Sequence, residues 1–136
     1  MLGVLGRGGF GTVYRADLLG EGSFVRPVAL KVLNPDMEGV TSVAARLRDE
    51  ARLLGRIRHR AVVHVDGLVR LDERWTVVME YVEGIDLAQI VAGGPLPPRA
   101  AFEIVGEVAA ALAVVHAWPG DDGRPLGILH RDLKPA

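Results

Sequence analysis

Three glycines near the start of the chain limit its possible folds more than any other feature. Gly6, Gly8 and Gly11 form the pattern G-x-G-x-x-G within the stretch LGRGGFGTVYRA. Glycines at this spacing let a backbone approach phosphates closely with its N–H groups exposed. A dinucleotide-binding turn would need a helix directly after the glycines, but Thr-Val-Tyr at residues 12–14 favours a strand. The pattern therefore predicts a glycine-rich hairpin, and it leaves open whether that hairpin binds phosphate or no ligand.

The other apolar patterns predict an α+β fold. Apolar runs bounded by turn residues indicate strands, and an apolar stripe with helical spacing indicates a helix. The order is strands, one helix, more strands and then helices, in two unequal parts with a seam near residues 82–86. We predict strands within 2–4, 12–15, 28–33, 62–71 and 75–82, a helix at 41–58 capped by Thr41 or Ser42, and a longer helix at 100–118. The predicted connections are loops at 18–27 and 118–127, a hairpin turn at 72–74 and a break at 93–98.

Composition and charge exclude several classes of function. The 136 residues carry a net charge of −1 and no cysteine, which argues against nucleic acid as a partner and excludes disulfides and thiolate metal sites. The apolar run at the N-terminus is too short for a signal peptide, and glycines interrupt it. The helix predicted at 100–118 contains Glu103 and Glu107, and its uninterrupted apolar run, 108–115, is too short to span a membrane. We therefore expect a soluble helix buried on most sides, no membrane segment in this chain, and a cytoplasmic location for this segment.

Two charged residues lie where apolar neighbours dominate. Lys31 lies in the middle of the apolar strand predicted at 28–33, and Glu50 lies on the apolar stripe of the helix predicted at 41–58. A carboxylate on an apolar face is costly unless it is paired, and Lys31 is one candidate partner. Arg46 is another, because it lies four residues before Glu50 on the same helix. The residues alone leave both pairings open.

The end of the chain gathers four polar side chains into a short segment. The sequence HRDLKP contains His130, Arg131, Asp132 and Lys134. With this segment the chain resembles, over essentially its whole length, the N-terminal part of a eukaryotic-type (Hanks-type) serine/threonine protein kinase domain, as found in bacteria. The resemblance rests on five motifs in the family's order: GRGGFGTV at 6–13, VALK at 28–31, an inward glutamate on the next helix, VMEYVEGIDL at 78–87 and HRDLKP at 130–135.

The resemblance implies both a fold and an activity. Residues 1–82 would form a small lobe of antiparallel strands plus one helix, and residues 83–136 would form the first helices of a large helical lobe, as far as the catalytic loop. The activity would be transfer of the γ-phosphate of ATP to a Ser or Thr hydroxyl of a protein substrate, with ATP and Mg²⁺ as cofactors.

The resemblance also implies a role for each matching residue. Lys31 would hold the α- and β-phosphates of ATP, and Glu50 would hold Lys31. Asp132 would accept the proton of the substrate hydroxyl, Lys134 would steady the transferring phosphate, and Asp86 would approach the ribose. The glycine flap, the adenine pocket and the backbone of the segment after it would supply the other nucleotide contacts: Leu5, Gly6, Gly8, Gly11, Val13, Ala29, Met79, Glu80 and Val82.

Two family motifs are absent from these 136 residues. The catalytic-loop asparagine and the Asp-Phe-Gly segment, whose aspartate binds magnesium, would both follow residue 136, so we expect no metal ligand within the chain. We therefore expect a partial kinase domain with no appreciable kinase activity by itself. A non-catalytic kinase-like module that binds nucleotide or a partner is the alternative.

Overall fold

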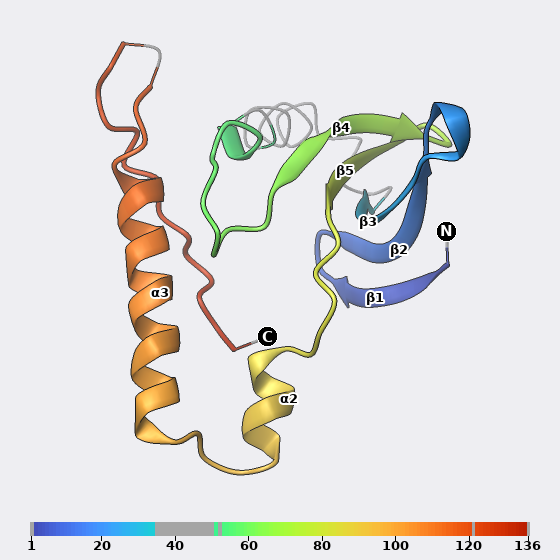
Figure 1. Ribbon diagram of the computed structural model, residues 1–136. Coiled ribbons are helices and arrows are strands. Elements are labelled where there is room, and N and C mark those ends of the chain that lie inside the picture. The colour runs from blue at the N-terminus through green and yellow to red at the C-terminus, as the bar shows by residue number, and fades with distance from the viewer. Residues whose placement is uncertain (1, 35–50, 52, 121, 136) are drawn as a thin grey trace. The chain divides into compact units, whose positions relative to one another are not determined.

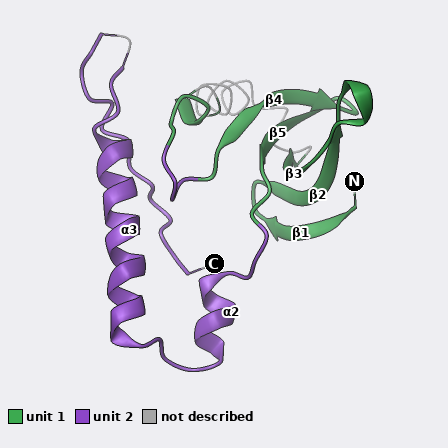
Figure 2. Ribbon diagram, viewed as in Figure 1, with its two compact units in different colours: residues 1–58, 63–82 green, residues 59–62, 83–136 purple. Residues whose placement is uncertain are grey.

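The computed structural model describes residues 2–34, 51, 53–120 and 122–135. The backbone divides into two compact units (Figure 2). Unit 1 comprises residues 1–58 and 63–82, and unit 2 comprises residues 59–62 and 83–136. Their interpretation as the two lobes of a kinase domain, divided at residue 82, stays a prediction.

Unit 1 is built on a five-stranded sheet in which neighbouring strands are antiparallel (Figure 1). The strand order across the sheet is β1-β2-β3-β5-β4, so only β3 and β5, which are not consecutive in the sequence, pair across a crossover. The strands are β1 (Gly3–Gly8), β2 (Gly11–Leu19), β3 (Val25–Leu33), β4 (Val65–Leu71) and β5 (Arg74–Glu80).

The connection between β2 and β3 is much shorter than the loop predicted at 18–27. The strands pair as far as Leu19 and Val25, and a single 3-10 turn, Glu21–Ser23, joins them. Pro27 suggested a loop because proline cannot donate to a ladder. In the structure Pro27 pairs with Asp17 of β2, while the pairing of β3 with β5 begins only at the next residue. Proline is therefore tolerated, because one side of the strand has no partner at that position.

The hairpin predicted at 72–74 is present between β4 and β5. Asp72 and Glu73 form its two-residue turn with φ values of 47° and 63°. Positive φ at both central positions matches the twist of the flanking strands, which explains why so tight a turn forms. The strand before it begins at Val65 rather than near residue 62, because residues 59–62 form a turn of their own, closed by the hydrogen bond from Val62 N–H to the His59 carbonyl.

Alternation along β3 gives the sheet two different faces. Val28 and Leu30 are buried on one face and form the core with Ala16 of β2, against which Tyr14, Leu71 and Val78 pack. The next residues along the strand, Ala29 and Lys31, lie on the opposite face because side chains alternate along a strand. This core cluster therefore lies on one face, while the face of Lys31 also contains buried residues, among them Ala29 and Val77.

Most of the helix predicted at 41–58, including Glu50 and its proposed N-cap, lies outside the described residues. Residues 51, 53 and 54 are helical, and the N–H of Gly55 donates to the Ala51 carbonyl at 2.9 Å. Ala51 and Ile57 are buried, but residues 55–56 form a turn and residues 57–58 are not helical, so the helix ends before the predicted Arg58.

Unit 2 contains two helices, α2 (Leu87–Ala92) and α3 (Pro98–His116). The carboxylate of Asp86 caps α2 by accepting from the N–H of Gln89 at 2.7 Å. α3 starts two residues earlier than predicted because Pro98 is the favoured residue for a first helical turn. The short segment 59–62 belongs to unit 2, and its Arg60 forms an ion pair with Glu107 of α3.

The loop predicted at 118–127 has no helix or strand among its described residues, and backbone contacts close it on itself. Pro119 and Pro125 face each other in an antiparallel bridge, and the N–H of Leu126 donates to the Trp118 carbonyl at 2.9 Å. Gly123 turns the chain with a φ of 76°, a conformation that glycine adopts without strain.

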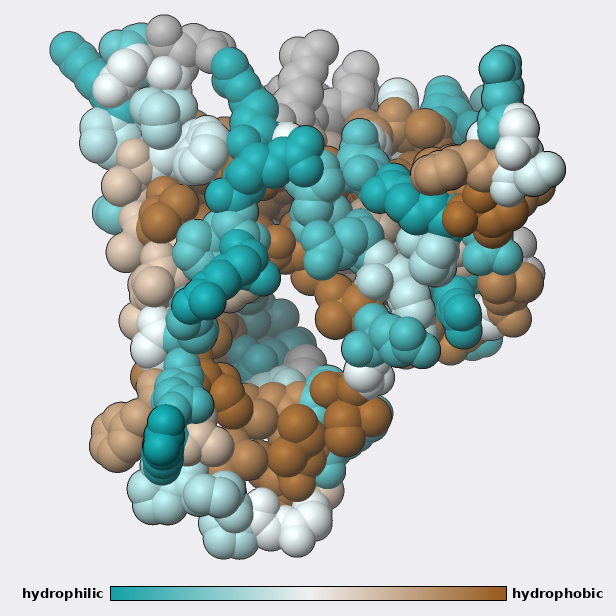
Figure 3. Space-filling model, in the orientation of Figure 1, coloured by the Kyte–Doolittle hydropathy of each residue, from teal (hydrophilic) through white to brown (hydrophobic). Residues whose placement is uncertain are grey.

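The apolar surface of unit 2 is largely exposed, contrary to the expectation that its long helix is buried on most sides. Ala111 is the buried residue of α3, whereas Phe102 and Val105 are 79% and 65% exposed. Figure 3 shows hydrophobic side chains gathered over α2, where Ile90 and Val91 are exposed. No helix within the described residues is both long enough and apolar enough to cross a membrane.

Candidate active site

The register of the sheet brings predicted site residues from four strands into cross-strand rows. Gly6 of β1 pairs with Val13 of β2, which pairs with Lys31 of β3, which pairs with Val77 of β5. Directly paired residues share a face, so Lys31 extends from the middle of this row between two valines. Among the described residues Lys31 has no ion pair, and its predicted partner Glu50 lies outside them.

The neighbouring rows complete the same face. Ala29 pairs with Met79, two residues from Lys31 along β3, and this row is apolar on β3 and β5. On the other side, Gly8 pairs with Gly11 next to the hairpin turn. Two more predicted contacts lie beside this face: Leu5 lies in a bulge of β1, and Val82 follows β5 and is exposed. One face of unit 1 thus presents an apolar patch, a lysine and a glycine-rich edge in succession.

The three motif glycines are required for different reasons. A Cβ atom on Gly11 would overlap the carbonyl oxygen of Val32 and come within 3.1 Å of the Leu33 Cα, so this glycine allows β2 to approach β3. A Cβ atom on Gly6 or Gly8 would meet nothing within 4 Å. The absence of side chains at these two positions therefore serves no packing purpose, and it leaves the backbone accessible to a ligand.

Asn34 holds the tip of this hairpin, a role that the sequence did not reveal. Its side-chain amide donates to the Gly9 carbonyl at 3.0 Å, and its backbone N–H donates to the Phe10 carbonyl at 3.2 Å. The signal in the sequence was only Asn34–Pro35 at the end of a strand, which indicates a strand end but no contact with the glycines.

Replacing Asn34 with alanine is expected to loosen the hairpin tip. The loss of one side-chain hydrogen bond should lower the free energy of unfolding by about 1 kcal/mol and speed amide hydrogen exchange at residues 9–11. Urea unfolding and exchange mass spectrometry measure the two effects. Asn34→Asp should behave like the alanine variant, because a carboxylate cannot donate to the Gly9 carbonyl, and full protection in Asn34→Asp would contradict this role.

Unit 2 carries the second group of predicted residues. The Lys134 ammonium lies 3.0 Å from the Asp132 carboxylate, and the Asp132 N–H donates to Nδ1 of His130 at 3.3 Å. Arg131 turns the chain there with a φ of 63°, which is uncommon for a non-glycine residue and frequent at functional sites. The Pro135 carbonyl then accepts from the Ala88 N–H of α2, the helix that Asp86 caps.

This arrangement presents an exposed carboxylate with an adjacent cation. The Asp132 and Lys134 side chains are 73% and 58% exposed, so both can reach a molecule outside the unit. A carboxylate can accept a proton from a hydroxyl, and an ammonium can offset the negative charge of a phosphate. Asp86 uses one carboxylate oxygen for its cap, which leaves the other for a ligand.

Comparison with known families covers the whole chain. A family model described as "Protein kinase domain" matches residues 1–136. Serine/threonine-protein kinase pkn2 of Myxococcus xanthus is 38% identical over 131 residues, which is 96% of this chain and 14% of that protein. Serine/threonine-protein kinase PrkC of Bacillus subtilis is 35% identical over 137 residues, 99% of this chain and 19% of that protein. The chain therefore spans less than a fifth of the length of these two relatives.

Solved structures also match nearly the whole chain. The PknI kinase domain of Mycobacterium tuberculosis matches with a TM-score of 0.74 at 31% identity, over 98% of this chain and 51% of that one. Rad53 residues 1–466, in complex with AMP-PNP, matches with a TM-score of 0.73 at 31% identity, over 97% of this chain and 31% of that one. The chain is thus similar to about half of the PknI kinase domain.

Proposed function

This chain belongs to the protein kinase domain family, and from that premise we propose that it supplies the nucleotide site and the catalytic aspartate of an ATP-dependent serine/threonine protein kinase. The relatives named above are serine/threonine protein kinases. The proposed reaction transfers the γ-phosphate of ATP to a Ser or Thr hydroxyl of a protein substrate.

One observation carries the nucleotide part of this proposal: the cross-strand row that places Lys31 between Val13 and Val77, with Gly6 paired to Val13. A lysine flanked by apolar side chains and an open glycine backbone suits a triphosphate whose base lies on apolar surface. The adenine would lie toward Ala29, with Leu5 and Val13 covering it and Met79 at the back of the pocket.

The catalytic part of the proposal rests on the side chains of unit 2. Asp132 would hold the substrate hydroxyl and accept its proton, and Lys134 would steady the phosphate during transfer. Phosphoryl transfer depends on positioning and on neutralising phosphate charge, which magnesium provides when it is bound. Its protein ligands are expected outside these 136 residues, so this chain's own contribution would be the lysine, the aspartate and the glycine backbone.

The 136-residue chain is expected to bind ATP without transferring phosphate. The test compares the chain alone with a chimera in which it is joined to the part of PrkC that follows the matching region. Titration with a fluorescent ATP analogue measures binding, and labelled phosphate on a generic basic protein measures transfer. The chain alone should show no turnover, while the chimera should approach the roughly one turnover per second that is ordinary for kinases.

The control is Asp132→Asn in the chimera. It keeps the side-chain shape but removes the base, so transfer should fall about 100-fold or more while ATP binding is retained. A chimera that binds ATP, folds and transfers nothing would favour the non-catalytic module instead. Turnover near one per second by the unjoined chain would contradict the expected dependence on the missing motifs.

A further inference from the structure

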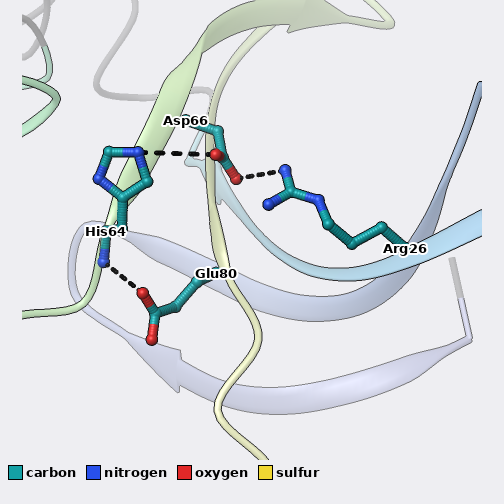
Figure 4. A network of polar contacts seen from close by, with 4 residues as sticks. All are labelled: Arg26, His64, Asp66 and Glu80. Atoms are coloured by element: carbon teal, nitrogen blue, oxygen red, sulfur yellow. Dashed lines mark hydrogen bonds and ion pairs between the residues drawn. The ribbon is translucent and has the colours of Figure 1, made fainter. Parts of the chain in front are cut away.

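A series of polar contacts connects β3 to the residue that ends β5 (Figure 4). The Arg26 guanidinium of β3 donates to the Asp66 carboxylate at 2.7 Å. The other oxygen of Asp66 lies 3.7 Å from Nε2 of His64. The backbone N–H of His64 in turn donates to the Glu80 carboxylate at 3.0 Å. The Glu80 side chain is thereby tied to the start of β4.

A bulge in β4 explains why the Glu80 side chain, rather than a backbone carbonyl, accepts the hydrogen bond from the His64 N–H. Val65 pairs with Met79 and Gly67 with Val78, so Asp66 is an extra residue in β4. A bulge disrupts the ladder locally and bends the strand that contains it. Just before it, the Glu80 N–H donates to the His64 carbonyl at 2.9 Å, and the return bond from the His64 N–H goes to the Glu80 carboxylate. The carboxylate thus completes the pairing where the ladder ends.

The hydrogen bond between His64 and Glu80 is partly buried, and the side chains around it are mostly covered. The side chains of His64 and Asp66 are 18% and 23% exposed. A hydrogen bond in such a setting is electrostatically stronger than in water, and a donor that loses its acceptor there is correspondingly costly. The ion pair with Arg26 keeps Asp66 facing the histidine ring, so the position of His64 is itself supported.

The next residue is held from the other direction. The Arg15 guanidinium of β2 lies over the Tyr81 ring, 4.9 Å from its centroid. Residues 80 and 81 are therefore fastened to β4 by a hydrogen bond and to β2 by a cation–π contact. This segment leads directly to Val82, whose backbone, with that of Glu80, is proposed to contact the adenine edge.

We propose that the Glu80 carboxylate is a positioning group for the adenine site. By accepting from the His64 N–H, it fixes the backbone of residues 80–82 in the geometry that the base requires. The role that the family resemblance gave Glu80 was a backbone contact, whereas this role belongs to its side chain. The inference rests on the proposed nucleotide-binding function, since it names a determinant of that same site.

The test separates recognition of the base from recognition of the phosphates. In the 136-residue chain, Glu80→Ala should weaken ATP binding about three- to tenfold, the range that corresponds to one lost hydrogen bond. Binding of inorganic tripolyphosphate, measured by competition with a fluorescent ATP analogue, should not change. Glu80→Gln should bind ATP like the unchanged chain, because its amide oxygen can still accept from His64. Glu73→Ala is the matched control: it removes an exposed carboxylate from the same hairpin and should alter neither affinity.

The outcomes distinguish this inference from the proposed function. An unchanged chain that does not bind ATP would overturn the proposed function itself. If the unchanged chain binds ATP and Glu80→Ala binds it equally well, or loses ATP and tripolyphosphate in equal measure, the positioning role is wrong. Should Glu80→Ala fail to fold, Asp66→Ala takes its place, because it removes the support of His64 and should produce a smaller loss for ATP alone. ATP affinity equal to that of the unchanged chain would then contradict the inference.

Discussion

Gly11→Val is expected to destabilise unit 1 by about 3 kcal/mol, because overpacking at a close backbone contact forces strands apart. The position is buried, and any Cβ there would overlap the Val32 carbonyl oxygen. The obstacle is backbone of the neighbouring strand, so no side-chain rotation can relieve it. Either β2 must move away from β3 or the hydrogen bonds near Leu33 must break.

Urea unfolding followed by tryptophan fluorescence measures this effect. Trp75 lies on β5 in unit 1, and a Trp118→Phe background removes the only other tryptophan from the signal. Gly3→Ala is the matched control, because its Cβ would meet nothing within 4 Å and the stability should change by no more than about 0.5 kcal/mol. Equal stabilities for Gly11→Val and Gly3→Ala would mean that β2 and β3 are not packed as the structure has them.

Gly8→Ala separates the packing role of a motif glycine from its role toward a ligand. Its Cβ would also meet nothing within 4 Å, so folding should be unaffected. The added methyl group would nevertheless stand on the face that carries Lys31. We therefore expect substitution of Gly11 to lower the free energy of unfolding, and substitution of Gly8 to weaken ATP binding.

The sequence predicted the fold class but not several element boundaries. The α+β fold is confirmed, and the hairpin at 72–74 forms where it was expected, since the apolar alternation on both sides of a charged turn is a local signal. α2 was not predicted because its six residues are too few to show helical spacing; Asp86 before them was the available sign, as an N-cap. The extension of β3 through Pro27 could not be predicted, because it depends on where β5 starts to pair.

In the candidate site, too, some features could be predicted from the sequence, and others required the tertiary structure. The rows that contain Lys31 and Ala29 follow from strand alternation once the register is known, and the resemblance supplied the residues. The side-chain roles of Asn34 and Glu80 required the tertiary structure, because each contacts a residue at least sixteen positions away in the sequence. The Lys31–Glu50 pair stays a prediction, since Glu50 lies outside the described residues.

Lys31→Ala is expected to weaken ATP binding by the 136-residue chain roughly 10- to 100-fold, the range expected for losing a hydrogen bond to a charged group. The lysine lies in the middle of β3 between Val13 and Val77, so removing it takes the cation from the predicted phosphate position while its row remains paired. Folding should survive, because Lys31 forms no ion pair with the residues that the structure describes, and an unfolding curve close to that of the unchanged chain verifies this.

The control for Lys31→Ala is a second variant of unit 1 that also loses one positively charged side chain. Arg74→Ala removes a positive charge of equal size from the exposed start of β5 in the same unit. A general electrostatic attraction of ATP to the sheet would be weakened by both substitutions, and only slightly, because exposed charges are screened by salt. A specific phosphate contact would be lost with Lys31 alone and would also reduce tripolyphosphate binding, in contrast to the effect expected of Glu80→Ala. Equal ATP affinities for Lys31→Ala and Arg74→Ala would show that the row centred on Lys31 is not where the phosphates bind, and the face of unit 1 would lose its assignment as a nucleotide site.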